Sequence, residues 1–252
     1  MSIVNSVIGW ISCPYPRPAA HLRLFCFPYA GGGLSVFRAW WRAFPEGVEV
    51  CPILPPGREQ RLSEDPFTEF DTYVKSLTAA LEPRLDLPYV FFGHSLGAIA
   101  AFECTRMLRR NSVAGPQMLF ASGCRAPQTP SRENPIHDLP REQFLEELRK
   151  LDGSPAEALA HPELMDLLLP AVRADFAVYE SYEYRPDNSL DCPIHVFGGL
   201  EDRRVTRDDL AGWSTHSTSA GTLRMFPGDH FFLHSARNAL IDAITSQLEG
   251  RT

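Results

Sequence analysis

The stretch YVFFGHSLGAIAAFECTRMLRR, residues 89–110, joins a strand pattern to a helix pattern through a turn of small residues. Its first four residues form an apolar run typical of a buried strand, and residues 96–110 have the pattern of a helix. Between them, GHSLG (93–97) matches G-x-S-x-G, a weak signal by itself because glycine and serine are common. In this context it predicts a nucleophile elbow, whose strained turn lifts the Ser95 hydroxyl above the sheet. The alternative is an ordinary loop in which Ser95 caps the helix.

Short apolar runs alternate with longer helical patterns along the rest of the chain. Strands that are covered on both faces are nearly continuous in apolar residues, and these runs have that character. The alternation predicts an α/β fold with a mostly parallel central sheet flanked by helices. The expected strands are 22–27, 48–53, 89–92, 118–122, 194–198 and 222–226, and the expected helices are 34–44, 69–82, 96–110, 207–215 and 235–248.

One long segment breaks this alternation. Residues 123–193 contain no convincing strand; three prolines open the segment, and helical patterns follow at 141–151 and 163–182. We expect a single domain spanning 1–252, with a helical lid inserted at about 126–190 over a site at the strand ends. The alternative is an extra helical layer that only enlarges the core.

Composition excludes several classes of function. The 252 residues include 44% hydrophobic residues, enough for a sizeable core, and the charge sum is 24 − 31 = −7. Nucleic acid and anionic membrane surfaces are therefore not expected as main partners, because both require clustered Lys and Arg. No apolar stretch reaches the roughly 20 residues that span a bilayer.

The cysteines indicate neither a metal site nor a redox motif. No CxxC pair occurs, and several cysteines lie in apolar runs, where a reduced thiol behaves as a small hydrophobe. We expect reduced thiols in a cytoplasmic protein. The N-terminal MSIVNSVIGWISC has no Lys or Arg and is interpreted as a strand or arm rather than a signal peptide. The six positions are Cys13, Cys26, Cys51, Cys104, Cys124 and Cys192.

A serine nucleophile needs a base, and the order in elbow folds is serine, acid, histidine. His230 is the best candidate because it follows the last strand pattern across a Pro-Gly turn. His234 lies four residues further on, but no Glu completes an HExxH pattern, so we discount a metal pair. The other histidines are His21, His94, His137, His161, His195 and His216.

The acid that orients the imidazole is expected after the strand 194–198. Asp202 lies in the Gly-rich loop that follows this strand, and Glu201 beside it is the fallback. Asp202 can also be an ordinary turn residue.

Backbone amides are expected to form the oxyanion hole. One is the N–H of Leu96, the residue after the nucleophile, and the other comes from the loop FPYAGGG (27–33), at Tyr29 or Ala30. Phosphate binding is the rival interpretation of this loop, but it lacks the Lys-Ser/Thr of a P-loop and the spacing of a dinucleotide fingerprint.

Five segments together resemble the type II thioesterases, the free-standing editing enzymes of nonribosomal peptide and polyketide synthesis. The resemblance runs from about Trp10 to the final helix, whereas other α/β-hydrolases share only the elbow and the general order. The segments are FPYAGGG (27–33), LPPGREQRL (54–62), FFGHSLGAIAAFE (91–103), ELMDLLLPAVRADF (163–176) and FPGDHFFL (226–233).

The resemblance implies an α/β-hydrolase fold with a helical lid before the acid-bearing strand. It implies Ser95, Asp202 and His230 as the triad, in agreement with their positions in the chain. It also implies hydrolysis of misprimed or stalled acyl groups from the phosphopantetheine arm of acyl or peptidyl carrier proteins. No metal or organic cofactor is implied, and we expect a monomer.

Aromatic side chains near the lid are expected to line an acyl pocket. Phe176, Tyr179 and Phe231 are the candidates, although aromatic residues on a helix are more often part of the core.

Carrier proteins are generally acidic, as this chain is, so docking must depend on a local basic or apolar patch. Arg125, Arg132 and Arg141 flank the expected lid and are candidates, with solvated surface arginines as the equal alternative. Arg58 and Arg61 are expected to make structural ion pairs instead.

Three other functions are compatible with this sequence. Another serine hydrolase, such as an esterase, lipase or peptidase, would share the triad and differ in its lid. A catalytically silent protein that docks to a synthase would not need the triad. Acyl transfer to a nucleophile other than water would use the same residues.

Overall fold

The centre of the molecule is a six-stranded sheet whose strand order is β2-β1-β3-β4-β5-β6. This structure, a computed structural model, describes residues 9–151 and 162–249. All neighbouring strands pair in parallel, and each expected strand is present to within two residues. The strands are β1 (Leu22–Phe27), β2 (Val48–Pro52), β3 (Tyr89–His94), β4 (Leu119–Ser122), β5 (Ile194–Gly199) and β6 (Leu223–Phe226).

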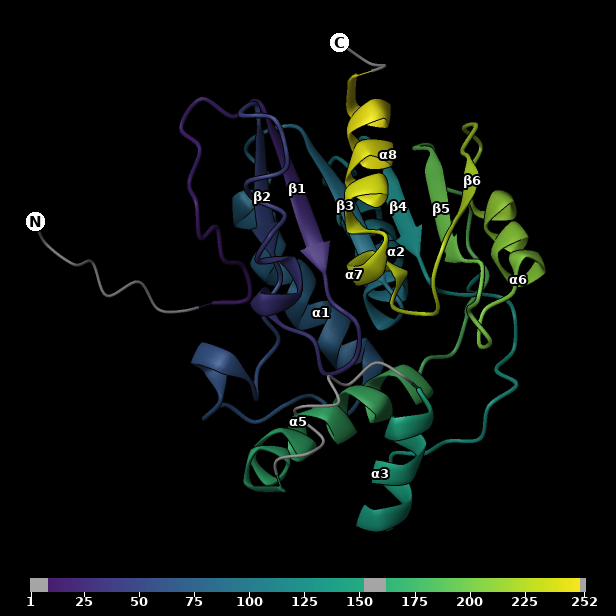
Figure 1. The fold of residues 1–252 in the computed structure, drawn as a ribbon. Coiled ribbons are helices and arrows are strands. Elements are labelled where there is room, and N and C mark those ends of the chain that lie inside the picture. The colour runs from purple at the N-terminus through teal and green to yellow at the C-terminus, as the bar shows by residue number, and fades with distance from the viewer. Residues whose placement is uncertain (1–8, 152–161, 250–252) are drawn as a thin grey trace, which may run out of the picture.

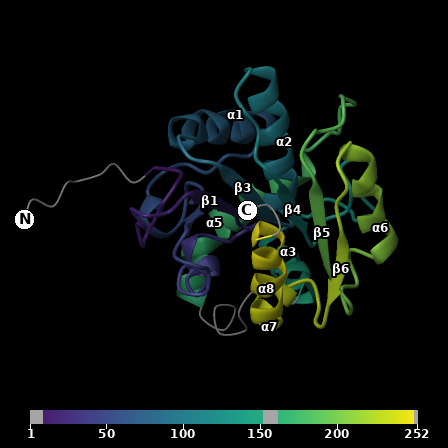
Figure 2. The same ribbon diagram turned by 90° about the horizontal axis from the view of Figure 1, so that it is seen from above.

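Helices cover both faces of the sheet, which explains the continuous apolar strands. Helices α1 (Phe70–Leu81) and α2 (Leu96–Arg110) lie on one face, and α7 (Phe232–Ser235) and α8 (Arg237–Glu249) lie on the other (Figures 1 and 2). The sheet therefore has one apolar core on each face. Successive side chains of β3 point into different cores: Phe91 lies in the core with α1 and α2, and Phe92 lies in the core with α8. The predicted α/β class is confirmed.

Two expected helices are shorter than the sequence predicts. Residues 34–44 form only the 3₁₀ helix η1 (Leu34–Phe37) followed by turns, with i→i+3 bonds such as Trp40 N to Phe37 O at 2.9 Å. Apolar residues spaced by three or four positions can pack on the sheet from 3₁₀ turns as well as from an α-helix. Their spacing therefore did not distinguish an α-helix from a series of turns. The expected 207–215 helix divides into α6 (Arg207–Ala211) and the 3₁₀ helix η4 (Gly212–His216).

Two further 3₁₀ turns, η2 (Glu59–Arg61) and η3 (Glu82–Arg84), lie in connections. Residues 11 and 12 run beside the end of β2, with an antiparallel bridge between Ile11 and Ile53. This part of the leader is therefore an arm along the edge strand. The rest of it, residues 1–8, and His161 lie outside the described residues.

The described residues between β4 and β5 form two helices, α3 (Arg141–Lys150) and α5 (Pro162–Glu180). Both lie beyond the carboxyl ends of the strands, below the sheet in Figure 1. They share a separate apolar cluster, whose buried members are Phe144, Leu148, Met165, Leu169 and Phe176. Within the ranges that the structure describes, no helix has the length and apolar character needed to cross a bilayer.

Candidate active site

Ser95 occupies a strained turn between β3 and α2. Its backbone has φ +54° and ψ −120°, which a non-glycine residue rarely adopts. Two close approaches require the flanking glycines: a Cβ at Gly93 would lie 2.1 Å from the Gly97 carbonyl oxygen, and one at Gly97 would lie 2.2 Å from that of Phe27. The Ser95 amide donates to the Ser122 carbonyl at 2.8 Å. This is the geometry of a nucleophile elbow rather than of a plain capping loop.

His230 and Asp202 meet at the carboxyl ends of β5 and β6. The Nδ1 atom of His230 lies 2.8 Å from Oδ2 of Asp202, and both side chains are buried. The other carboxylate oxygen accepts hydrogen bonds from the amides of Arg204 (2.8 Å) and Val205 (3.1 Å). Burial raises the pKa of Asp202, but the hydrogen bond to His230 and these amides outweigh it, so its pKa lies below the ordinary value. The ionised carboxylate fixes the Nδ1–H tautomer and leaves Nε2 as the basic nitrogen.

The two acids that the sequence proposed differ in their surroundings. The Asp202 side chain is inaccessible to solvent and contacts His230, whereas Glu201 is exposed. His234, which the sequence analysis discounted as a metal ligand, has its Nε2 atom 3.0 Å from the hydroxyl of Tyr29.

A cavity of about 280 Å³ lies next to Ser95 and His230. It is lined by Ser95 and His230 together with the three expected oxyanion residues, Leu96, Tyr29 and Ala30. Leu96 begins α2, where amides have no partner within the helix.

The first two loop amides after Ala30 are already committed to other acceptors. The amide of Gly31 donates to Asp175 at 2.6 Å, and that of Gly32 donates to the Tyr29 carbonyl at 2.8 Å. Tyr29 and Ala30 are therefore the loop residues best placed to serve the site.

A buried ion pair holds this glycine-rich loop in place. Arg58 and Asp175 form a two-pronged pair in which Nη2 lies 2.7 Å from Oδ1, and both side chains are only 5% exposed. Arg58 also donates to the Gly32 carbonyl at 3.0 Å. Because Asp175 lies on α5 and accepts from the Gly31 amide, the pair ties the helix over the site to the loop beside Ser95. The sequence predicted an ion pair for Arg58 but not its partner.

Sequence reasoning also missed His94, which is fully buried beside the site. Its Nδ1 atom lies 2.9 Å from the Ser122 hydroxyl, and its ring centroid is 5.2 Å from that of His230. Burial lowers the pKa of His94 well below its usual value, so the ring is neutral. It packs against the His230 ring without adding a charge. Its place inside the elbow motif was the available signal.

A family model described as a thioesterase domain matches residues 22–248. The chain belongs to this thioesterase family, and it is a hydrolase of thioesters.

Relatives and solved structures agree with this membership. Over 248 residues the thioesterase is 42% identical to the gramicidin S biosynthesis protein GrsT of Aneurinibacillus migulanus, covering 98% of this chain and 97% of GrsT. It is similar to ClbQ from the colibactin NRPS/PKS pathway, with a TM-score of 0.88 and 31% identity over 92% of this chain and 98% of ClbQ. It is also similar to the type II thioesterase BorB from the borrelidin biosynthetic cluster, with a TM-score of 0.85 and 32% identity over 95% and 96% of the two chains.

The three aromatic residues expected at an acyl pocket all reach the cavity of this thioesterase. Phe176, Tyr179 and Phe231 line the same space as Ser95. Phe176 and Tyr179 also line a second cavity of about 980 Å³ between α5 and residues 125–136. Phe176 has a core role as well, because its ring packs edge-on against Phe144 of α3.

The expected basic residues are all engaged in local contacts. The guanidinium of Arg125 lies 5.4 Å from the centre of the Tyr179 ring, and Arg132 pairs with Asp209 at 2.9 Å. Arg141 pairs with Asp166. Each contact is compatible with a solvated surface arginine, so the structure does not single out a basic docking patch among the three.

Breaking the Arg58–Asp175 pair is expected to slow this thioesterase as well as destabilise it. Asp175→Asn leaves a buried guanidinium without its counter-charge, which typically costs about 3–5 kcal/mol of unfolding free energy. Because the loop beside Ser95 loses its anchor, we expect kcat to fall at least roughly tenfold with a smaller change in KM. Urea unfolding and steady-state kinetics measure the two effects.

The matched control is Asp71→Asn, which breaks the Arg185–Asp71 pair, whose two side chains are 69% and 70% exposed. It should cost less than about 1 kcal/mol and leave kcat unchanged. An Asp175→Asn protein with wild-type kcat would show that the pair does not position the loop.

Proposed function

We propose that this thioesterase hydrolyses acyl groups from the phosphopantetheine arm of acyl or peptidyl carrier proteins in natural-product biosynthesis, removing misprimed or stalled units. The observation that carries the chemistry is the shared cavity of Ser95 and His230, with the His230 ring held by Asp202. The similarity to GrsT, ClbQ and BorB, which belong to such biosynthetic systems, supports the class of substrate.

The proposed reaction proceeds through an acyl-enzyme. The Ser95 oxygen attacks the thioester carbonyl while His230 Nε2 takes the hydroxyl proton. The oxyanion accepts hydrogen bonds from the Leu96 amide and from that of Tyr29 or Ala30. When the carbonyl re-forms, the C–S bond breaks, and His230 returns its proton to the departing thiolate. Water, deprotonated by His230, then attacks the ester and releases the carboxylic acid and Ser95.

The electrostatics of the site support these roles. Asp202, ionised and shielded from water, stabilises the imidazolium that forms at each proton transfer. Pre-aimed amides of the oxyanion type typically contribute about 3–4 kcal/mol each to transition-state stabilisation. The phosphopantetheine thiol belongs to the substrate, so the proposed steps need no resident cofactor.

Helices α3 and α5 are proposed to act as the lid of this site. They lie beyond the carboxyl ends of the strands, and α5 contributes Phe176 and Tyr179 to the cavity. An acyl chain entering there would meet the aromatic faces of these two side chains and of Phe231. The larger cavity adjoins the same wall and offers additional room.

A comparison of leaving groups tests this function. A panel of acyl groups is loaded onto an isolated carrier protein, and their loss is followed by intact mass; the same acyl groups are offered as small oxygen esters. We expect carrier-bound thioesters to be hydrolysed at the higher kcat/KM. Faster turnover of the oxygen esters would identify a general serine esterase instead, and no turnover of either by folded protein would favour a silent docking protein.

A further inference from the structure

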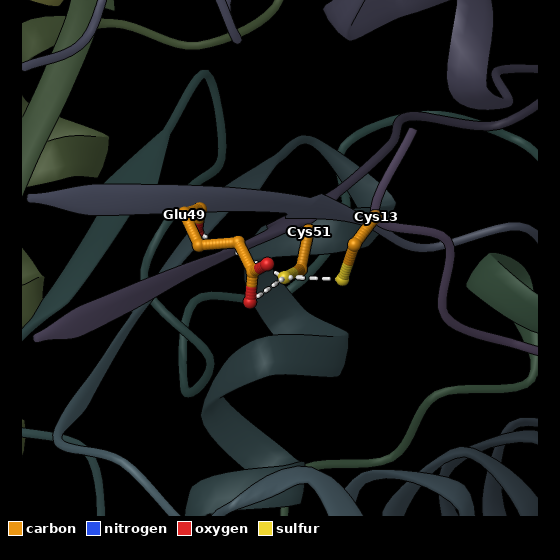
Figure 3. Close-up of side chains that lie close together, drawn as sticks. All are labelled: Cys13, Glu49 and Cys51. Atoms are coloured by element: carbon orange, nitrogen blue, oxygen red, sulfur yellow. Dashed lines mark hydrogen bonds between the residues drawn. The ribbon is translucent and has the colours of Figure 1, made fainter. Parts of the chain in front are cut away.

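Two cysteines outside the active site bring their sulfur atoms into contact. The Sγ atoms of Cys13 and Cys51 lie 2.8 Å apart. Figure 3 shows the two side chains pointing toward each other. Cys51 lies on β2, the edge strand of the sheet. Cys13 follows the arm beside that strand, where the Ser12 amide donates to the Pro52 carbonyl at 3.1 Å. Both backbones are therefore held, and the thiols face one another in the folded protein.

The two thiols differ in their access to solvent. Cys51 is fully buried, whereas Cys13 is half-buried and can be reached by a small reagent. The remaining four cysteines are shielded: Cys26, Cys104, Cys124 and Cys192 are at most 7% exposed. An external reagent therefore meets Cys13 first, with Cys51 directly behind it.

The hydrogen bond between the two thiols favours a division of roles. The hydrogen bond from Cys51 lowers the pKa of the Cys13 thiol, whereas the same bond and burial raise the pKa of Cys51. Cys13 is thus the more readily ionised thiol and the better nucleophile. The carboxylate oxygen Oε2 of Glu49 lies 3.8 Å from the Cys51 sulfur, on the side away from solvent.

The arrangement of Cys13, Cys51 and Glu49 does not suit a bound metal ion. Cys13, Cys51 and Glu49 together resemble a ligand set for a thiophilic cation. Both carboxylate oxygens of Glu49, however, already accept hydrogen bonds, from the Arg17 amide at 3.1 Å and from Arg23 Nε at 2.8 Å. Two thiolates bound to one tetrahedral zinc at about 2.3 Å would stand roughly 3.8 Å apart, further than these sulfurs do.

We propose that Cys13 and Cys51 are a reversible dithiol–disulfide pair, oxidised by a small-molecule disulfide with which Cys13 reacts first. The Cys13 thiolate displaces one thiol from the reagent and forms a mixed disulfide with its other half. The Cys51 thiol then loses its proton, attacks the Cys13 sulfur of the mixed disulfide and displaces the second thiolate, which takes up a proton. Two protein thiols are oxidised to one disulfide, and the reagent is reduced to two thiols.

The disulfide would join the arm covalently to the edge strand. That arm also supports the loop after β2: the Leu54 amide donates to the Trp10 carbonyl at 2.7 Å, and the Arg61 guanidinium lies 5.0 Å from the centre of the Trp10 ring. Oxidation therefore stabilises this side of the molecule without consuming a residue of the active site.

Oxidised glutathione provides the test. After incubation, intact mass should show the loss of two hydrogen atoms, and peptide mapping should show Cys13 linked to Cys51. The thermal midpoint should rise by roughly 5–10 °C and return when dithiothreitol is added. Cys51→Ser should instead accumulate a glutathione adduct at Cys13, and Cys13→Ser should prevent both products.

Cys192→Ser serves as the matched control and should oxidise as the wild type does. A wild-type protein that carries only a stable glutathione adduct would overturn the proposal. So would an unchanged mass, or a disulfide that involves other cysteines. Hydrolytic activity is measured separately, because the pair lies outside the catalytic residues and its oxidation is scored by mass, peptide mapping and the thermal midpoint.

Discussion

Ser95→Ala is expected to abolish acyl-enzyme formation and to lower kcat for carrier-bound thioesters by a factor of about 10⁴–10⁶. The Ser95 hydroxyl oxygen is the atom proposed to attack the thioester carbonyl. Alanine lacks this hydroxyl but is small enough to occupy the same turn. The backbone of residue 95 at φ +54° is strained in both proteins, so folding is preserved. Intact-mass analysis of the carrier protein measures the rate of acyl loss.

A fluorophosphonate probe provides the second readout for Ser95→Ala. Wild-type protein should be labelled at Ser95, and the variant should not be labelled, while circular dichroism shows the same fold for both. Equal rates of acyl loss in the two proteins would remove Ser95 from the mechanism.

Asp202→Asn is expected to lower kcat about 10⁴-fold while the protein remains folded. The carboxylate accepts the Nδ1 proton of His230 at 2.8 Å. An amide in its place can donate to Nδ1, which puts the ring proton on Nε2 and leaves no base for the Ser95 hydroxyl. Because binding is not altered by this change, KM should move far less than kcat.

Glu201→Gln is the matched control for Asp202→Asn, because it removes the same charge from the adjacent, exposed residue. It should retain wild-type turnover. If Asp202→Asn were fully active and Glu201→Gln were not, the assignment of the acid would be reversed.

Local patterns determined much of the fold. Strands β1 to β5 were visible as apolar runs because both of their faces are covered, whereas only Phe226 of β6 is buried. The elbow was equally visible, because its close approaches require glycine at positions 93 and 97. The pattern failed where packing rather than spacing decides: residues 34–44 are mostly turns, although Phe37, Trp40 and Phe44 are buried as a helix would bury them.

The order of residues along the chain was enough to predict the three candidate catalytic residues. Ser95, Asp202 and His230 were predicted from their positions after β3, β5 and β6, since the carboxyl ends of parallel strands lie at one edge of a sheet. The structure brings the three aromatic candidates to the same cavity. Their catalytic and binding roles stay predictions until the variants are measured.

The sequence by itself therefore determined the α/β class, the elbow and the order of the three candidate catalytic residues, because each is recorded in a local pattern or in chain order. Only the tertiary structure decided which acid contacts His230, which carboxylate neutralises Arg58, and that Cys13 meets Cys51. These are contacts between residues that lie 28, 117 and 38 positions apart. No local preference encodes such a pair, because its two members become neighbours only when the sheet and the helices around it have packed.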